Sequence, residues 1–161
     1  GATPEFFRAL NIQAPREAVE APDFSLPDSA GKPVRLGAFR GRHVFLNFFA
    51  TWCGPCREEM PAMERLHRMF GARGLTVLAV ALQEPPGTVA KFSADLRLTF
   101  PALIDSHGRV AREFAVRGLP VTYLVDPRGR LLWRAFGARD WSGRVARKYF
   151  AAILEGQARN R

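Results

Sequence analysis

One feature constrains the fold most: an apolar run followed, within a few residues, by two cysteines and a helical pattern. Residues 44–49 form a nearly continuous run of strand-favouring side chains, which is typical of a strand buried on both faces. Residues 56–70 carry apolar side chains at helical spacing, and Gly71 follows at the expected helix end. Cys53 and Cys56 are therefore predicted where a buried strand ends and a helix begins.

The predicted helix over 56–70 has an apolar stripe that includes several methionines. We expect these side chains to fill the core rather than to bind copper, and we expect Pro61 to kink the helix. The stripe consists of Met60, Met63, Leu66, Met69 and Phe70.

The remaining segments alternate between strand and helix patterns. Residues 24–26 and 34–36 alternate at period two around a turn sequence, which predicts a β-hairpin. We expect further strands at 75–82, 100–104, 121–125 and 130–136, and helices at 88–98, at 110–114 and from a Ser142 cap to about Gly156. This order predicts a three-layer α/β sandwich with a mixed central sheet.

Length, charge and cysteine content narrow the class of protein. A chain of 161 residues fits one domain, which we place at residues 21–161 after a lead-in of residues 1–20. Within the lead-in, a short amphipathic turn is expected to cap the core with Phe6, Phe7, Leu10 and Ile12. The net charge of +9 is scattered, without a phosphate loop or an aromatic-interleaved basic run, so nucleic-acid binding is not expected.

Two cysteines are too few for a disulfide scaffold and leave a redox pair, half a zinc site or coincidence. A zinc site would need two more ligands, and the three histidines are isolated in the sequence, so no metal is expected. The longest apolar stretch, 44–50, is too short to span a bilayer. The chain begins at Gly without a secretory leader pattern, so we expect that a preceding segment has been removed.

The position of the cysteine pair suggests thiol chemistry without an added cofactor. Cys53 is expected at a helix N-terminus, where free N–H groups and the helix dipole favour a thiolate and make it the nucleophile. Cys56, one turn later and more buried, is placed to resolve a mixed disulfide. Pro55 suits the first helical turn, and Trp52 offers a flat apolar surface to a partner protein.

The segment from Trp52 to Cys56, read Trp-Cys-Gly-Pro-Cys after a buried strand, resembles the signature of the thioredoxin superfamily. The downstream segment from Arg117 to Thr122 is similar to the family's cis-proline segment. This resemblance implies that Pro120 is cis and lies next to Cys53, and that the backbone of Leu119 pairs with an extended client peptide. The pair Gly54-Pro55 matches the reducing members of the superfamily.

Residues 20–157 resemble the TlpA/ResA-like branch in more detail. The similar segments are 21–26, 31–34, 46–48, 57–61 and 139–142. The resemblance implies a bacterial, periplasmic or extracytoplasmic protein, sometimes held by an N-terminal anchor, that reduces client disulfides in cytochrome c biogenesis or copper-site assembly. It also implies a membrane-borne electron donor, and we take a monomer as the default.

Two departures from plain thioredoxin bear on the mechanism. Thioredoxin has a buried Asp six residues before its first cysteine, whereas this chain has Asn47, which cannot act as a base. An inserted helix and strand are expected over residues 84–105, and the branch carries an acid at their start. We therefore predict Glu84 as the base near Cys56.

Three alternatives remain open from the sequence. The opening at residues 21–26 is shared with peroxiredoxin-like proteins, but the upstream Pro and Thr of a peroxidatic cysteine are not at their spacing. A reduced cysteine pair can bind Cu(I), as in a metal-binding or chaperone module, although Pro120 would obstruct a metal at Cys53. An oxidant of the same fold is the third alternative, because extracytoplasmic compartments need both activities.

Overall fold

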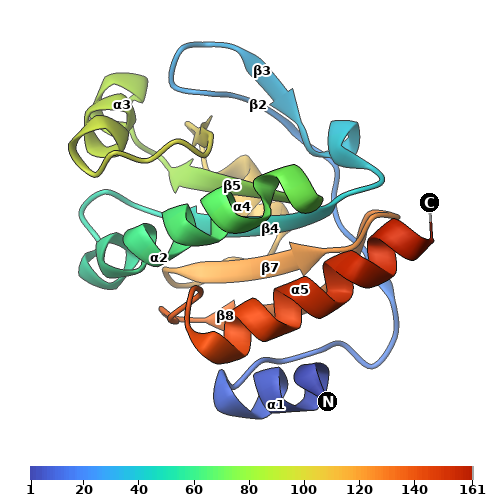
Figure 1. Ribbon diagram of the computed structural model, residues 1–161. Coiled ribbons are helices and arrows are strands. Elements are labelled where there is room, and N and C mark those ends of the chain that lie inside the picture. The colour runs from blue at the N-terminus through green and yellow to red at the C-terminus, as the bar shows by residue number, and fades with distance from the viewer. Residues whose placement is uncertain (161) are drawn as a thin grey trace.

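A six-stranded mixed sheet runs through the molecule in the order β1-β8-β7-β4-β5-β6, shown in Figure 1 in a computed structural model that describes residues 1–160. The strands are β1 (Val19–Glu20), β4 (His43–Phe49), β5 (Leu75–Leu82), β6 (Ala102–Asp105), β7 (Val121–Val125) and β8 (Arg130–Phe136). Strand β4 pairs in parallel with β5 and antiparallel with β7, which makes the sheet mixed.

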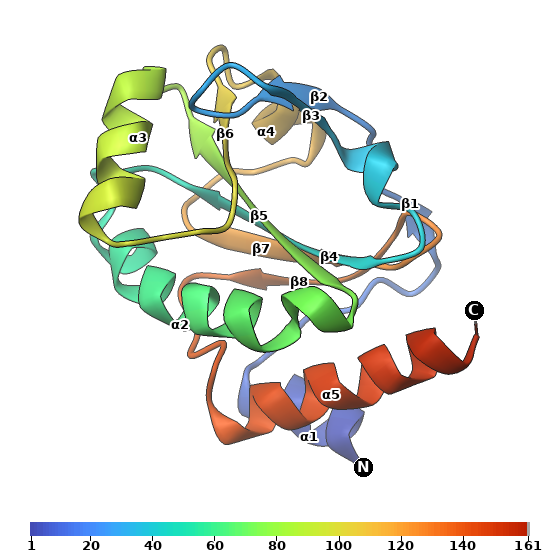
Figure 2. The ribbon, with the colours of Figure 1, turned by 45° about the horizontal axis from the view of Figure 1, so that its top comes forward.

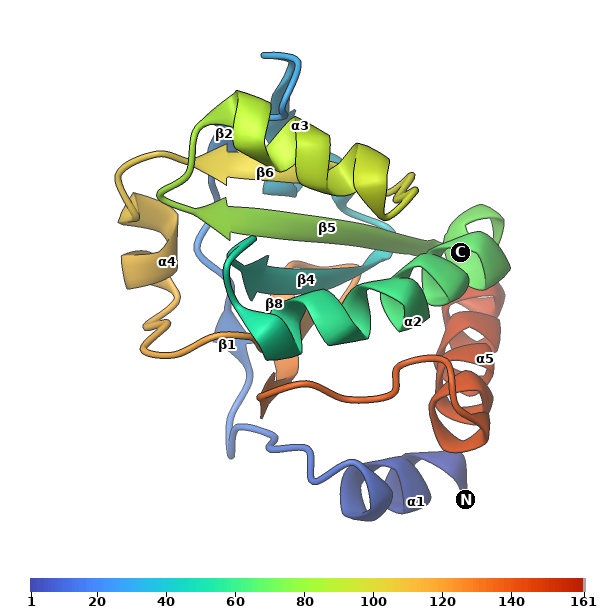
Figure 3. The same cartoon turned by 90° about the vertical axis from the view of Figure 1, so that its left-hand side faces the viewer.

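Helices cover both faces of this sheet, as Figures 2 and 3 show from two directions. The helices are α1 (Ala2–Ala9), α2 (Gly54–Phe70), α3 (Pro86–Asp95), α4 (Arg109–Glu113) and α5 (Arg144–Arg159), with 3-10 turns η1 (Leu36–Phe39) and η2 (Gly71–Arg73). Helices α1, α2, α3 and α5 share one core with the sheet. Helix α4, η1 and the hairpin of β2 (Ser25–Pro27) and β3 (Pro33–Arg35) share the other. The predicted fold class is therefore confirmed.

The burial of strand β4 explains its position inside the sheet, between β7 and β5. Every residue of β4 is buried, and its side chains alternate between the two cores. Phe45 and Phe49 face the core under α2, whereas Leu46 and Phe48 face the core under α4. The period of two therefore places Asn47 on the α2 side, directly below the helix that carries the cysteines.

The N-terminal segment packs on the same side as α5. The ring of Phe6 is buried and stacks on Tyr149 of α5, with ring centroids 3.9 Å apart. Ile12 joins the same core, so the expected capping of the core by this segment is confirmed; Phe6 and Phe7 lie in helix α1, and Leu10 and Ile12 follow it. The chain then adds the short edge strand β1 to β8. In the part of the chain that the structure describes, no helix has the length and apolar character needed to cross a bilayer.

Several expected details of the fold differ from the structure. The last helix begins at Arg144 with Gly143 as its N-cap, so the predicted Ser142 cap is wrong. The Ser142 hydroxyl instead accepts a hydrogen bond from the Arg65 Nε at 2.9 Å. Met69 is 38% exposed and not in the core, because it lies on the outer side of the last turn of α2. The inserted helix and strand are present as α3 and β6, with α3 ending three residues earlier than expected.

Candidate redox site

The cysteine pair lies at the junction of β4 and α2. Cys53 is the N-cap of α2, and its Sγ accepts a hydrogen bond from the Cys56 N–H at 3.3 Å. The two sulfurs are joined as a disulfide. Cys53 is 7% exposed and Cys56 is fully buried. Cys53 is thus the sulfur closer to solvent, and it lies where the helix offers free N–H groups to a negative charge.

The surroundings of Cys53 combine an exposed aromatic ring with a proline loop. Trp52 is 75% exposed, which is unusual for a residue of this size. The peptide bond between Leu119 and Pro120 is cis, as the resemblance implied. Val121 pairs with Phe48 near the end of β4, so Pro120 lies just before β7 at the end of the sheet where β4 leads into Cys53.

Gly54 and Pro55 are both exposed, and they extend the surface that Trp52 begins. Leu119 is half-buried beside Pro120. The structure therefore brings the predicted client-binding residues to one edge of the sheet around Cys53. Their role in binding a client stays a prediction.

Glu84 faces the loop that leads to the cysteines. Its side chain is 9% exposed, and both of its carboxylate oxygens are bound by Thr51. The Thr51 N–H donates at 2.9 Å and the Thr51 hydroxyl at 2.5 Å. Because Thr51 is two residues before Cys53, Glu84 anchors the active-site loop to the end of β5. Its predicted action as the base near Cys56 stays a prediction.

Glu59 is a second buried carboxyl, and the sequence did not single it out. It lies on α2 three residues after Cys56, on the adjacent turn, and is 3% exposed. Its Oε1 accepts from the Asn47 amide at 2.8 Å. Its Oε2 accepts from the Trp141 indole N–H at 2.9 Å and from the Arg139 backbone N–H at 3.1 Å.

Burial raises the pKa of Glu59 to about 7, although the hydrogen bonds from Trp141, Arg139 and Asn47 oppose this shift. A carboxyl with this pKa exchanges its proton near neutral pH, which suits a group that serves a thiol.

The contact with Glu59 explains why this chain has Asn47 where thioredoxin has a buried Asp. The Asn47 amide donates both to Glu59 and to the Thr122 hydroxyl, at 2.8 and 3.0 Å. An Asp at this position would place a second carboxylate against Glu59, where two negative charges repel each other. The Asn47 Oδ1 is buried and has no hydrogen-bond partner among the described residues. If the amide turned over, this oxygen would accept a hydrogen bond from the protonated Glu59 carboxyl.

Comparison with known proteins identifies the family. The model of the AhpC/TSA family matches residues 18–134. This chain belongs to the AhpC/TSA family. The matched part includes both cysteines, Glu59, Glu84 and Pro120. It ends before residues 139 and 141, which donate hydrogen bonds to Glu59.

Similar members of the family carry thiol–disulfide names. The chain is 44% identical to the thiol-disulfide oxidoreductase ResA of Geobacillus thermodenitrificans over 69% of this chain and 64% of that protein. It is 35% identical to ResA of Bacillus subtilis over 72% of this chain and 65% of that protein. The matched segments therefore span just under two thirds of these relatives.

A solved structure extends the similarity over most of this AhpC/TSA-family chain. A Chlorobium tepidum protein, provisionally assigned as a thiol:disulfide interchange protein DsbE, superposes with a TM-score of 0.78 at 34% identity. The superposition covers 86% of this chain and 97% of that protein. The thioredoxin-like fold inferred from the motifs is thereby confirmed.

Sequence reasoning found the cysteines, the proline loop and Glu84 in this family member, but it missed Glu59. One signal was present: Glu59 follows Cys56 by three residues, so both must share a face of α2. The donors that bind Glu59 come from β4 and from residues 139 and 141, which are distant in sequence. Their convergence on one carboxyl is decided by tertiary packing.

Proposed function

We propose that this protein is a thiol–disulfide oxidoreductase that reduces disulfides in extracytoplasmic client proteins. The observation that carries the proposal is the placement of Cys53 at the N-cap of α2, bonded to the fully buried Cys56 and preceded by the exposed Trp52. The names of the ResA and DsbE relatives support the same activity.

The reaction starts from the reduced pair. The Cys53 thiolate attacks one sulfur of the client disulfide, forming a mixed disulfide and releasing the other client sulfur, which takes up a proton. The N-terminus of α2 stabilises the negative charge on Cys53 before the attack. Trp52 and the backbone at Leu119 hold the client segment beside it.

Resolution requires a second thiolate from within the protein. Cys56 loses its proton and attacks the Cys53 sulfur, which releases the second client thiolate and regenerates the Cys53–Cys56 disulfide. The sequence predicted Glu84 as the base near Cys56; we propose that Glu59 accepts the Cys56 proton instead, because it lies on the next turn of α2 and its pKa is raised to about 7. Glu84 keeps Thr51, and with it Cys53, in place during both steps. Two electrons pass from the cysteine pair to the client.

The client class follows from the family resemblance. Apocytochrome c and copper-binding proteins carry cysteines whose disulfides must be reduced to thiols before a haem or metal is attached. The oxidised pair must then be reduced again, for which we propose a membrane-borne thiol donor, with the protein acting as a periplasmic or extracytoplasmic monomer.

The deciding experiment is the equilibrium reduction potential of the Cys53–Cys56 pair in thiol redox buffers. A value near about −270 mV, the thioredoxin end of the range, would support a reductase. A value near about −120 mV would instead assign the protein as a disulfide-forming oxidant. Peroxide consumption and Cu(I) titration of the reduced protein test the peroxidase and copper-binding alternatives.

A trapping experiment tests the order of the two cysteines. In Cys56→Ser, the mixed disulfide between Cys53 and a client peptide should accumulate, because the resolving thiol is missing. In Cys53→Ser, no such adduct should form, since Cys56 is fully buried. Equal trapping by both variants would contradict the assigned roles.

A further inference from the structure

The loop over residues 137–143 links two parts of the redox site. At its start, the Gly137 N–H donates to the Pro120 carbonyl at 2.8 Å. Further along, the Arg139 N–H and the Trp141 indole both donate to the Glu59 Oε2. The position of this loop therefore sets two of the three hydrogen bonds that Glu59 receives.

The Arg139 side chain fixes the loop by binding main-chain carbonyls on both sides of it. Its Nη1 donates to the carbonyls of Phe136 and Ala138, at 2.7 and 3.2 Å. Its Nε donates to the Leu10 carbonyl at 2.6 Å, and its Nη2 to the Asn11 carbonyl at 3.3 Å. One guanidinium thus joins the loop to the N-terminal segment.

The carbonyls of Leu10 and Asn11 belong to the end of helix α1, where free carbonyls and the negative end of the helix dipole favour a cation. This segment is itself held firmly. Phe6 packs against Tyr149 and Trp133, and Gln13 exchanges two backbone hydrogen bonds with Arg134 of β8. Figures 1 and 3 show α1 next to the first turns of α5, close to where the chain enters that helix.

We propose that Arg139 and the N-terminal segment, residues 1–13, form a positioning element that holds the hydrogen-bond donors of Glu59 in place. The segment acts through Arg139, which itself touches Glu59 only with its backbone N–H. Both parts lie outside residues 18–134, the part that the family model matches. This inference rests on the proposed function.

Other charged groups also surround Glu59. An open hollow between α2 and the loop is lined by Glu58, Arg65, Arg139 and Asp140, together with Glu59 itself. Asn47 and Trp141 contribute neutral donors from the core. The test must therefore separate the effect of the Arg139 charge on Glu59 from the effect of the guanidinium hydrogen bonds that fix the loop.

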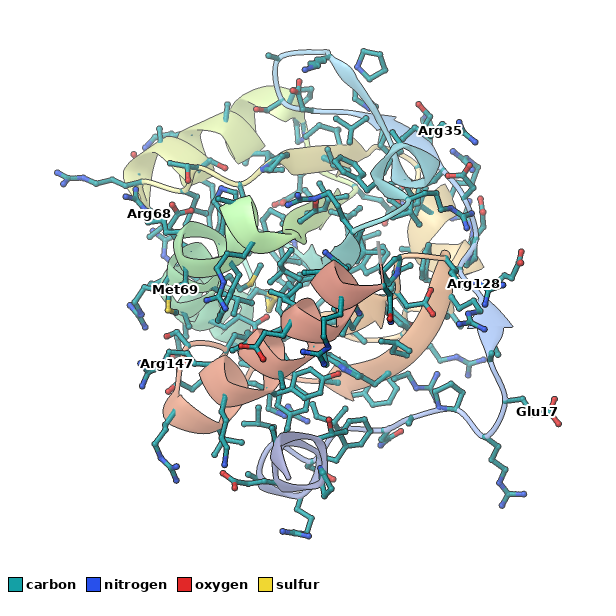
Figure 4. The ribbon with its side chains drawn as sticks, turned by 45° about the vertical axis from the view of Figure 1, so that its right-hand side comes forward. Glu17, Arg35, Arg68, Met69, Arg128 and Arg147 are labelled. Atoms are coloured by element: carbon teal, nitrogen blue, oxygen red, sulfur yellow. A yellow bond between two sulfur atoms is a disulfide. The ribbon has the colours of Figure 1, made fainter. Side chains whose placement is uncertain are left out.

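The experiment uses three single variants of the full chain. Arg139→Met removes the charge and the hydrogen bonds, whereas Arg139→Lys keeps the charge and loses the fork of donors. Arg147→Met is the matched control, since Arg147 is exposed on the outer face of α5 at the edge of the molecule in Figure 4. The measurements are the carboxyl titration of Glu59 by 13C NMR and the pH profile of the rate at which dithiothreitol reduces the disulfide.

We expect both Arg139 variants to raise the pKa of Glu59. The loop would no longer hold the Arg139 N–H and the Trp141 indole against the carboxylate, while the side chain stays buried. A shift of half a pH unit corresponds to about a threefold change in rate on one limb of the profile. Arg147→Met should leave both readouts at their wild-type values. If Arg139→Lys also matched the wild type, the charge alone would matter and positioning would be refuted.

A milder change tests the N-terminal segment itself. Phe6→Leu keeps an apolar side chain but loses the stacking on Tyr149, so it should move the Glu59 midpoint in the same direction by a smaller amount. In an Arg139→Met background, Phe6→Leu should have no further effect, because the connection is already broken. Additive shifts would overturn the proposed route through Arg139.

Failure of the inference can be told from failure of the proposed function. If the wild type reduces client disulfides and Glu59→Gln changes the pH profile, but the Arg139 and Phe6 variants do not, only the positioning element is refuted. If the wild type exchanges no disulfide with a client, the proposed function fails, whatever the Glu59 titration shows.

Discussion

Two buried carboxyls are linked to the segments around the disulfide, Glu59 through helix α2 and Glu84 through Thr51, and they are bound in different ways. Glu59 comes from α2 and is bound by donors from β4 and from the loop at residues 137–143. Glu84 follows β5 and is bound at both oxygens by the single residue Thr51. The first lies within the core, and the second lies at its edge beside the active-site loop.

This difference suits the two carboxyls to different tasks: Glu59 to proton exchange and Glu84 to anchoring the loop before Cys53. Enclosure raises the pKa of Glu59 to about 7, so that it can gain and lose a proton near neutral pH. The two hydrogen bonds from Thr51 instead make Glu84 an anchor for the chain before Cys53. We therefore expect changes at Glu59 to alter pH dependence, and changes at Glu84 to alter the rate through the position of the loop.

The largest expected effect is on the pH dependence of stability. Because the pKa of Glu59 is raised from 4.5 to about 7, the folded protein keeps a proton that the unfolded chain releases. The free energy of unfolding should therefore fall by about 3 kcal/mol as the pH rises from below 4.5 through 7. Glu59→Gln should remove this contribution, as urea denaturation at pH 5 and pH 8 would show. Equal pH dependence in both proteins would refute the role of burial.

A second prediction adds a charge beside Glu59. Asn47→Asp would place a carboxylate where the amide now donates to Glu59 at 2.8 Å. At pH 8 the two acids repel each other, and we expect the variant to lose about 2 kcal/mol of unfolding free energy, with a smaller loss at pH 5. The check is thermal or urea unfolding at both pH values, and Asn47→Ala controls for the lost hydrogen bonds. A loss independent of pH would show that the acids do not interact.

A third prediction concerns Glu84. An amide offers one acceptor oxygen instead of two, so Glu84→Gln should release one hydrogen bond to Thr51 and slow resolution of the mixed disulfide near pH 7 by about fivefold, or about 1 kcal/mol. Stopped-flow measurement of product release gives the rate. Unchanged kinetics would remove Glu84 from the mechanism.

The chain offers a matched control for Glu84. The Glu64 carboxylate, two turns beyond Cys56 on α2, is also bound by the N–H and the hydroxyl of one threonine, Thr99, at 2.7 and 2.6 Å, and it forms an additional ion pair with Arg68 at 2.7 Å. Glu64→Gln should therefore cost similar stability without changing the exchange rate. Equal slowing by both variants would mean that the Glu84 effect is only structural.

The smallest expected effect on stability is at Trp52, which is not among the hydrogen-bond partners of Glu59 or Glu84. With its ring 75% exposed, Trp52→Ala should change the unfolding free energy by less than about 0.5 kcal/mol. It should raise KM for a client protein while leaving the pH profile unchanged, since it removes binding surface only. A shifted pH profile in this variant would undo the separation between client binding and proton transfer.

Most of the fold follows from local patterns. The run at residues 44–49 and the helical stripe after Cys56 predicted β4 and α2, and the motif predicted a cis Pro120. The errors fall where a side chain has a partner that the local sequence does not reveal. Ser142 resembles a helix cap, but its hydroxyl accepts from Arg65, and the helix begins after Gly143.

The sequence by itself predicted thiol–disulfide chemistry for this protein, because Trp52 to Cys56 carry the Trp-Cys-Gly-Pro-Cys motif between a buried strand and a helix. It also predicted the layers of the fold, since the spacing of apolar residues along each helix and strand indicates which face is buried. Only the tertiary structure decided which carboxyl has a pKa near neutral pH. The groups that bind Glu59 come from residues 47, 139 and 141, and a raised pKa depends on burial and partners that exist only after these segments pack together.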